Sequence, residues 1–224
     1  MRTLDTLLTD GRWFAALDAA QQARLRAETV VREAAAQETV VHKGAPAEHW
    51  IGVIDGLVKI ATVSADGRAV TFTGVPAGGW LGEGSMLKDE PRRYDVVALR
   101  ASRVALVPRD TFRWLLDSSI AFNRFVLGQL NERLGQFIGT VEHDRLLGPQ
   151  GRVARCLAQL MHPQLYPGSR DGLALSQAEL GLLTGLSRQS VNRALRDLES
   201  RGLLCVHYGR IDVPDPDALR DAAP

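Results

Sequence analysis

The sequence predicts an α+β protein in three parts: an N-terminal β-barrel of the jelly-roll type, one long helix, and a C-terminal domain of short helices that ends in a β-hairpin. Short β-branched runs alternate with turn residues between positions 29 and 108, which is typical of small barrels. An apolar repeat with helical spacing follows, and after it come two helices with strong start signals. We therefore expect a barrel domain over 1–118, a helix over 119–147 and a second domain over 148–224.

The composition is that of an ordinary globular chain. Its 224 residues suffice for two modest domains, and a formal net charge of +1 means that any basic surface must be local. Cys156 and Cys205 form no CxxC pair, which excludes a four-cysteine zinc or iron–sulfur site within one chain. Neither a signal peptide nor a run of about 18 apolar residues is present, so we expect a cytoplasmic protein with no membrane partner.

The first 108 residues combine short helices with strands. Residues 1–28 are rich in Ala, Leu, Gln and Arg and predict helices. Asp55-Gly56 and Asp66-Gly67 each separate two strand-like runs, and Asp-Gly in that position predicts a hairpin. Pro108 comes where the helical region begins, as proline does at a first helical position. The predicted strands lie within Trp50–Ile54, Leu57–Val63, Ala69–Val75, Val96–Leu99 and Val104–Val107.

The predicted helix over 119–147 would be roughly 43 Å long at about 1.5 Å per residue. Its apolar residues form two strips, which suits a helix that packs on its own domain with one strip and on a partner chain with the other. Alternatively, the whole helix packs on the barrel of its own chain. Gly148-Pro149-Gln150-Gly151 ends the helix and marks the domain boundary. The first strip, a coiled-coil-like seam that predicts a homodimer, consists of Leu127, Leu130, Leu134, Phe137 and Val141; the second consists of Phe122, Val126 and Ile138.

Two capped helices joined by a short turn are predicted after residue 175. Ser176 and Glu179 have capping-box spacing, Gly185 ends the first helix, and Ser187 caps the second. This arrangement is the helix-turn-helix motif. The apolar residues of the second helix share one face, so its arginines, glutamine and asparagine face outward. Such side chains hydrogen-bond base edges in the major groove.

The outward face of the second helix predicts a site for double-stranded DNA. Between residues 186 and 210, five arginines stand against Asp197 and Glu199, a local charge of +3 that suits phosphates. A β-hairpin within 203–213 would complete a winged helix. The plainer alternative is a helical hairpin with a solvated face. The candidate DNA-binding residues are Ser176, Ser187, Arg188, Gln189, Ser190, Asn192, Arg193 and Arg196.

The order of these parts resembles the CRP/FNR family of bacterial transcriptional regulators, and the resemblance covers nearly the whole chain. Its most specific pieces are Gly82-Glu83 followed ten residues later by Arg93, Gly151-Arg152-Val153-Ala154 after the long helix, and the run Ser187–Arg193. The resemblance implies a homodimer on a palindromic operator, with RNA polymerase as a further partner and with no enzymatic activity. An enzyme on a cupin-like barrel is disfavoured, because the clustered histidines that its metal needs are missing.

The resemblance also implies an effector site in the barrel. In cyclic-nucleotide-binding members, the glutamate matched by Glu83 contacts the ribose hydroxyl, and the arginine matched by Arg93 pairs with the cyclic phosphate. Gly82 and Gly84 would allow close backbone approach. The alternative for Glu83 and Arg93 is an internal salt bridge.

The chain departs from the cAMP-binding pattern at Tyr94, Phe137 and Ile138, which stand where those members have hydrogen-bonding residues. We therefore expect an anionic, nucleotide-like effector, with weak or no cAMP binding; cyclic di-GMP is an open candidate, since Phe137 could stack on a base. Oxygen sensing through a cluster is excluded, because the N-terminal region has no cysteine, and haem sensing through one of the five histidines stays open. Two further alternatives are a constitutive regulator without an effector and a ligand-binding module that contacts only proteins.

Overall fold

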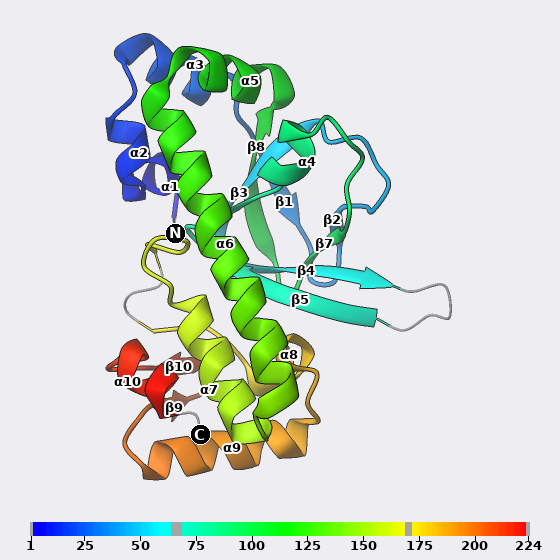
Figure 1. The fold of residues 1–224 in the computed structure, drawn as a ribbon, viewed down its shortest axis with the longest axis vertical. Coiled ribbons are helices and arrows are strands. Elements are labelled where there is room, and N and C mark those ends of the chain that lie inside the picture. Colours follow the sequence, from blue (N-terminus) through cyan, green and yellow to red (C-terminus); the bar gives the residue numbers. More distant parts are fainter. Residues whose placement is uncertain (1, 64–68, 169–171, 223–224) are drawn as a thin grey trace.

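The computed structural model describes residues 2–63, 69–168 and 172–222. The long helix α6 (Ile120–Leu146) runs along the molecule and joins the barrel and N-terminal helices to the C-terminal helices (Figure 1). The α+β class, the jelly-roll barrel, the long helix and the C-terminal winged helix-turn-helix predicted from the sequence are confirmed. The division into domains at 118 and 148 stays a prediction.

The other elements follow the predicted order. The N-terminal helices are α1 (Leu4–Asp10), α2 (Arg12–Ala15) and α3 (Ala19–Glu28). The barrel comprises β1 (Val30–Ala34), β2 (Thr39–Val41), β3 (His49–Asp55), β4 (Leu57–Val63), β5 (Ala69–Pro76), β6 (Trp80–Leu81), α4 (Glu83–Leu87), β7 (Asp95–Ala98) and β8 (Ser102–Pro108). The remaining elements are α5 (Arg109–Ser118), α7 (Pro149–Leu160), α8 (Gln177–Thr184), α9 (Arg188–Ser200), β9 (Cys205–His207), β10 (Arg210–Asp212) and α10 (Pro216–Asp221).

The barrel consists of two four-stranded antiparallel sheets, with strand orders β1-β8-β3-β6 and β2-β7-β4-β5. β4 and β5 form the hairpin predicted around Asp66-Gly67, whose own turn lies outside the described residues. The hairpin predicted at Asp55-Gly56 is wrong, because β3 and β4 belong to different sheets. Gly56 has a φ of +96°, and a Cβ there would lie 2.3 Å from the Ser102 hydroxyl. The glycine therefore serves a tight corner that takes the chain from one sheet to the other.

An aromatic cluster fixes the N-terminal helices and the start of α6 on the barrel. Trp50 and Trp80 stack with ring centroids 3.9 Å apart, and Trp13 of α2 packs edge-on against both rings. Phe122 of α6 contacts Trp13 and Trp50. Each such pair contributes about 0.5–1.5 kcal/mol beyond the burial of its area. Pro108 is the last residue of β8 and the N-cap of α5, one position before the helical position that the sequence predicted.

Helix α6 buries one face and exposes another. Phe122 and Val126 are buried against the barrel, as predicted, but Ile138 is 62% exposed. The prediction that Ile138 continues this strip is wrong, because twelve residues beyond Val126 a helix has turned by roughly 120° away from it, at 3.6 residues per turn. The exposed apolar residues, which we call the α6 strip, are Leu127, Leu134, Phe137, Ile138 and Val141. Leu130, also part of the predicted seam, is half-buried.

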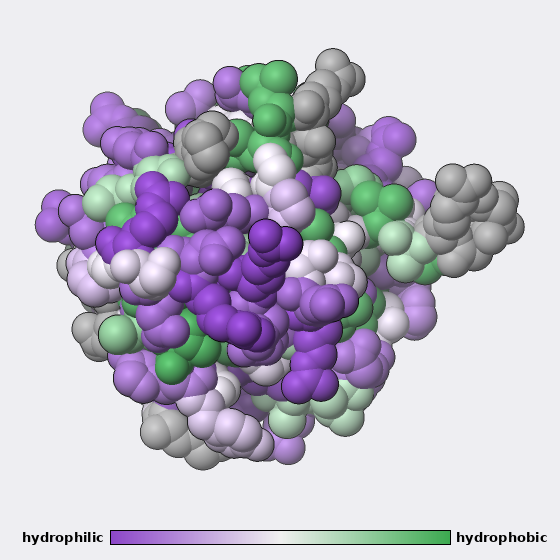
Figure 2. Space-filling view, turned by 90° about the horizontal axis from the view of Figure 1, so that it is seen from below, coloured by the Kyte–Doolittle hydropathy of each residue, from purple (hydrophilic) through white to green (hydrophobic). Residues whose placement is uncertain are grey.

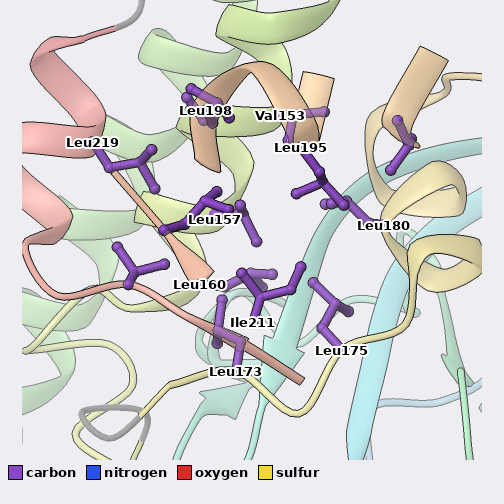
Figure 3. Close-up of a cluster of buried hydrophobic side chains, with 14 of the residues drawn as sticks. Val153, Leu157, Leu160, Leu173, Leu175, Leu180, Leu195, Leu198, Ile211 and Leu219 are labelled. Carbon is purple, nitrogen blue, oxygen red and sulfur yellow. The ribbon is translucent and has the colours of Figure 1, made fainter. Parts of the chain in front are cut away.

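The C-terminal helices surround a leucine-rich core (Figure 3). Leu157 of α7, Leu180 of α8 and Leu195 of α9 are each at most 1% exposed. The wing is confirmed, since β9 and β10 pair antiparallel. Because the core takes one face of α9, the opposite face is directed out of the molecule, at the end remote from the barrel (Figure 1).

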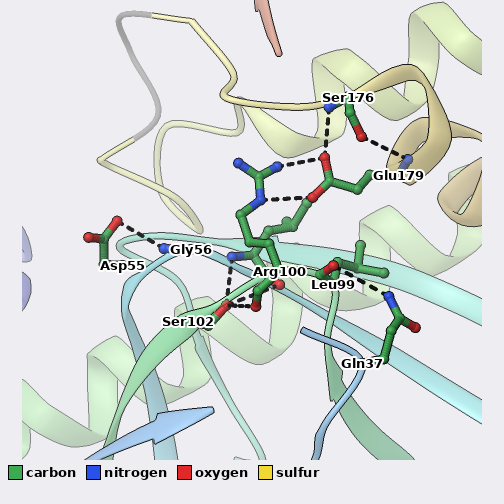
Figure 4. A network of polar contacts seen from close by, with 9 residues as sticks. Gln37, Asp55, Gly56, Leu99, Arg100, Ser102, Ser176 and Glu179 are labelled. Carbon is green, nitrogen blue, oxygen red and sulfur yellow. Dashed lines mark hydrogen bonds and ion pairs between the residues drawn. The ribbon is translucent and has the colours of Figure 1, made fainter. Parts of the chain in front are cut away.

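The barrel and the C-terminal domain share buried side chains. Leu57 and Leu99 of the barrel are buried in the C-terminal core, whereas Tyr166, from the segment after α7, is buried in the barrel core. Between the two, the Arg100 guanidinium donates to both carboxylate oxygens of Glu179 at 2.8 Å (Figure 4). Glu179 also belongs to the capping box of α8, so this ion pair holds the start of the helix-turn-helix on the barrel.

Candidate DNA-binding face and effector site

The start of α9 is fixed by local hydrogen bonds. The Ser187 hydroxyl accepts from the backbone N–H of Ser190 at 3.2 Å, and Gly185, with a φ of +66°, ends α8 as predicted. Val191 and Leu198 are fully buried, which settles the rotation of the helix about its own axis. The helix therefore presents its polar residues as one outward face.

The outward face of α9 gathers cationic and amide side chains. Figure 2 views this end of the molecule from below and shows strongly hydrophilic side chains spread over it. These groups have the geometry needed to bind phosphates and base edges, since arginine pairs with guanine and glutamine with adenine. A shallow groove between the beginnings of α8 and α9 is lined by Gln177, Arg188, Gln189, Asn192, Arg193 and Arg196.

Seven of the eight predicted DNA-binding residues divide into two groups. Arg188, Gln189, Arg193 and Arg196 are exposed on the outward face. The hydroxyls of the three serines, by contrast, take part in helix caps: Ser176 accepts from the backbone of Glu179, and Ser187 and Ser190 contact each other. Their contacts with DNA remain a prediction.

Gln177 was missed by the sequence analysis. The Asn192 amide donates to the Gln177 side-chain oxygen at 3.1 Å and its own oxygen accepts from Arg196, so these three residues form one network. The sequence could have indicated Gln177, because in a helix-turn-helix the residue directly after the cap of the first helix lies beside the start of the second helix.

The wing places a second polar group beside α9. Tyr208 at its tip is fully exposed. Asp212 pairs with both Arg210, at 2.5 Å, and His207, at 3.1 Å. The wing therefore presents an exposed aromatic side chain at its tip, and the charged groups next to it are paired with one another.

The structure adds a second candidate for the arginine of the effector site, and the assignment of Arg93 stays a prediction. Arg93 is directed to solvent, with its side chain 72% exposed and paired with Glu90. Arg92, its neighbour, is 2% exposed and donates to the backbone oxygens of Gly82, at 2.9 Å, and of His49. The two neighbours therefore point in different directions in the segment just before β7, and a spacing of ten in the sequence falls on the exposed one.

Gly82 is required by this geometry. It has a φ of +96°, and a Cβ at this position would lie 2.3 Å from the Arg92 guanidinium. At Gly84 a Cβ would meet no atom within 4 Å, so the chain itself does not crowd that position. The two glycines that the sequence analysis grouped together therefore have different surroundings.

Charged and polar groups surround Glu83, whose side chain is 7% exposed. Burial lowers the pKa of Arg92, while nearby Tyr94 and Glu83 oppose that effect. Burial also raises the pKa of Tyr94, and the Glu83 charge raises it further. Tyr94 is therefore part of this group and keeps its proton, while its contact with an effector stays a prediction.

The α6 side chain that reaches Glu83 is Arg133, which was absent from the sequence prediction. Its Nε lies 3.5 Å from Glu83 Oε1, and both side chains are buried. Although burial opposes its charge, Tyr166 and Glu83 raise the pKa of Arg133. Phe137 and Ile138, predicted to contact the effector, are 38% and 62% exposed and belong to the α6 strip. Within one chain, the α6 residue beside Glu83 is therefore Arg133.

Among the residues that the structure describes, no three His, Cys, Asp or Glu side chains gather as metal ligands would. In the same residues, no helix combines the length and the apolar character needed to cross a bilayer. Three histidines lie beside carboxylates: His42 near Asp95, His162 near Glu132 and His207 near Asp212.

A helix-turn-helix with a cationic outward face, joined through one long helix to a jelly-roll barrel, defines a DNA-binding transcriptional regulator rather than an enzyme. Comparison with known families agrees: residues 31–119 match the cyclic nucleotide-binding domain, and residues 151–222 match the Crp-like helix-turn-helix domain. The chain belongs to the CRP/FNR family of regulators.

The similar proteins are regulators of the same kind. A CRP-like cAMP-activated global transcriptional regulator of Mycobacterium tuberculosis is 29% identical over 188 residues, 81% of this chain and 82% of that protein. The cAMP-activated global transcriptional regulator CRP of Haemophilus influenzae is 26% identical over 175 residues, 77% of this chain and 78% of that protein.

Solved structures support the fold. FixK2 from Bradyrhizobium japonicum superposes with a TM-score of 0.69 at 21% identity, covering 86% of this chain and 96% of that one. The c-di-GMP responsive global regulator CLP of Xanthomonas campestris gives a TM-score of 0.60 at 24% identity, covering 88% and 99%.

Replacement of Arg193 by alanine should weaken DNA binding. If the guanidinium reads a base, its loss should cost about 1–3 kcal/mol on the preferred site and relax specificity there. If it contacts a phosphate, all sequences should weaken alike and the salt dependence should fall by about one unit. Fluorescence anisotropy with a duplex selected from random DNA, at several salt concentrations, measures both quantities.

Arg201→Ala is the matched control, since Arg201 is exposed but lies at the C-terminal end of α9. It changes the net charge equally and should affect affinity much less. Equal losses in the two variants would contradict a specific role for the outward face.

Proposed function

We propose that this regulator acts as a homodimer on a palindromic operator and responds to an anionic, nucleotide-like effector held at Glu83 and Arg92. The observation that carries the proposal is the buried group beside α4, where a carboxylate and a guanidinium lie on either side of Gly82. A carboxylate suits a ligand hydroxyl and a guanidinium suits a phosphate. RNA polymerase is the further partner we propose, because a dimer fixed on a promoter holds its barrels next to the polymerase site.

Dimerisation through the α6 strip follows from its exposure. The strip contains five large apolar side chains on one helix, between 38% and 65% exposed. Four of them, Leu127, Leu134, Phe137 and Val141, follow one another at intervals of three and four residues once half-buried Leu130 is included, which is the spacing of a two-helix seam. Contiguous exposed apolar surface of this kind marks an interaction site. Two such helices side by side would bring two α9 helices to the same side of the dimer, as two half-sites about 34 Å apart require.

A constitutive regulator is the second candidate, and one observation favours it. The space bounded by Trp50, Trp80, Glu83 and Gln129 is too small to admit a water molecule, whereas ligand pockets usually measure about 300–1,000 Å³. In this conformation Arg133 fills the position beside Glu83. An effector would therefore have to displace Arg133 or enter from the side of Gly84.

Leu134→Glu should dissociate the dimer. Two glutamates would face each other across an apolar seam, where like charges without a partner are strongly unfavourable. Light scattering coupled to size exclusion should give the mass of one chain for this variant and twice that mass for the wild type. Asn131→Glu, on an exposed polar position of the same helix, should remain a dimer. A dimeric Leu134→Glu protein would exclude the seam.

Arg92→Gln and Arg93→Gln separate the two candidate effector arginines. Calorimetric titration with cyclic di-GMP and with cAMP should show nucleotide binding that weakens at least about tenfold in Arg92→Gln, through loss of a charge-assisted contact. Binding should persist in Arg93→Gln, because that side chain faces solvent. Loss of nucleotide binding in Arg93→Gln alone would show that Arg93, as predicted from the sequence, is the effector arginine.

Tight cAMP binding that depends on Arg92 would contradict the expectation that Tyr94, Phe137 and Ile138 disfavour cAMP. Absence of binding by either nucleotide, with DNA binding intact, would favour the constitutive regulator.

A further inference from the structure

Tyr166 belongs to the C-terminal half of the chain but lies inside the barrel. It follows α7 in the sequence and is 1% exposed among barrel residues. Its ring lies on the backbone of Gly79, where an added Cβ would come within 2.8 Å of it. Its hydroxyl donates to the backbone oxygen of Gly74 in β5 at 3.2 Å. Leu165 beside it is equally buried in the barrel core, and Tyr166 adds a buried hydroxyl to the contacts that hold the start of the link to the helix-turn-helix.

The same hydroxyl meets the arginine that pairs with Glu83. Arg133 Nη1 donates to the Tyr166 hydroxyl at 3.3 Å, while its other terminal nitrogen donates to the backbone oxygen of Trp80. Arg133 Nε faces Glu83 at 3.5 Å. One buried guanidinium thus contacts the proposed effector site on one side and the C-terminal domain on the other.

This group has unsatisfied polar atoms. Glu83 Oε2, Arg133 Nε and Arg92 Nε are buried and find no hydrogen-bond partner among the residues that the structure describes. Buried polar atoms normally find partners, and a charged group at low dielectric depends strongly on its counter-ion. A change at Glu83 should therefore be transmitted to Arg133, which has few ways to compensate.

Other contacts hold the segment after α7 in place without involving Glu83. Gln129 of α6 donates to the backbone oxygen of Gln164 at 3.0 Å, and His162 pairs with Glu132 at 3.2 Å. These contacts hold residues 161–166 along α6. The ion pair of Arg100 with Glu179 joins the barrel to α8 at a different place.

We propose that Tyr166 is the positioning residue through which Glu83 controls the placement of the DNA-binding domain, with Arg133 as the link between them. While Arg133 is neutralised by Glu83, it holds the Tyr166 hydroxyl and keeps residues 161–168 in the barrel. When Glu83 is altered, Arg133 turns away, Tyr166 loses a partner, and α9 is less firmly oriented for DNA.

The regulatory meaning of this link rests on the proposed function, since an effector held at Glu83 and Arg92 would change the contact of Glu83 with Arg133. The link itself needs no ligand. Its test can therefore succeed where nucleotide titration fails, and can fail where nucleotide titration succeeds.

A double-mutant cycle in the full-length protein tests the link. Glu83→Gln, Tyr166→Phe and the double variant are compared by anisotropy on the duplex selected with the wild type. Tyr166→Phe keeps the ring and removes only its hydroxyl. Glu83→Gln should weaken binding about fivefold or more in the wild-type background, the lower end of usual coupling between sites, and less than about twofold in the Tyr166→Phe background.

Arg100→Gln supplies the matched control, because it removes an interdomain ion pair without touching Arg133. In that background the effect of Glu83→Gln should persist in full. Thermal unfolding of each variant accompanies the cycle, and Glu83→Asp, which keeps the charge on a shorter side chain, replaces Glu83→Gln if the latter is poorly folded.

Two results would overturn the proposal. One is an effect of Glu83→Gln that is equal with and without the Tyr166 hydroxyl, which would make the two sites independent. The other is unchanged DNA affinity when Glu83 is altered in every background.

Discussion

The neutralisation of one buried arginine ties the parts of this molecule together. Arg133 lies on the helix that spans both halves of the chain, and its side chain is 8% exposed. A buried guanidinium needs an anion and hydrogen-bond acceptors. It finds them in three elements: Glu83 on α4, the backbone of Trp80 and the hydroxyl of Tyr166. Because these partners come from the barrel and from the segment after α7, a change in any one of them alters the relation between the barrel and the helix-turn-helix.

The rest of the interface reinforces this arrangement without duplicating it. Leu57 and Leu99 of the barrel complete the C-terminal core, and the ion pair of Arg100 with Glu179 anchors the capping box of α8. The apolar contacts of Leu57 and Leu99 hold the two domains together but respond little to a charged ligand. A buried ion pair responds strongly, since separating it leaves an uncompensated charge. The molecule therefore combines an apolar interdomain interface with a buried ion pair, Arg133 with Glu83, which weakens when Glu83 changes its charge or its partners.

The sequence predicted the elements well because their signals are local. Capping boxes, a turn glycine and an apolar face suffice to place α8 and α9, and β-branched runs place the strands. Strand partners are not local: Asp55-Gly56 has the composition of a hairpin turn, yet β3 and β4 join different sheets. Arg92 and Arg93 show the same limit, since a motif spacing cannot tell which of two neighbours points inward. For Arg133, absent from the prediction, the sequence does carry a signal, since Gln129, Arg133, Gln136 and Thr140 form a polar strip at helical spacing between the apolar strips of α6.

Amide hydrogen exchange on the effector-free protein gives the most direct measurement of this interdomain link. Arg133→Met keeps an unbranched side chain of similar reach but removes the charge, so Glu83 loses its counter-ion and the Tyr166 hydroxyl loses its donor, keeping only the backbone oxygen of Gly74 as a partner. The structure predicts faster exchange in two segments at once, residues 161–168 and β5, with the N-terminal helices and the core of α9 still protected. Unchanged exchange in residues 161–168, in a variant that remains folded, would show that packing alone holds the C-terminal domain and would contradict the role given to Arg133.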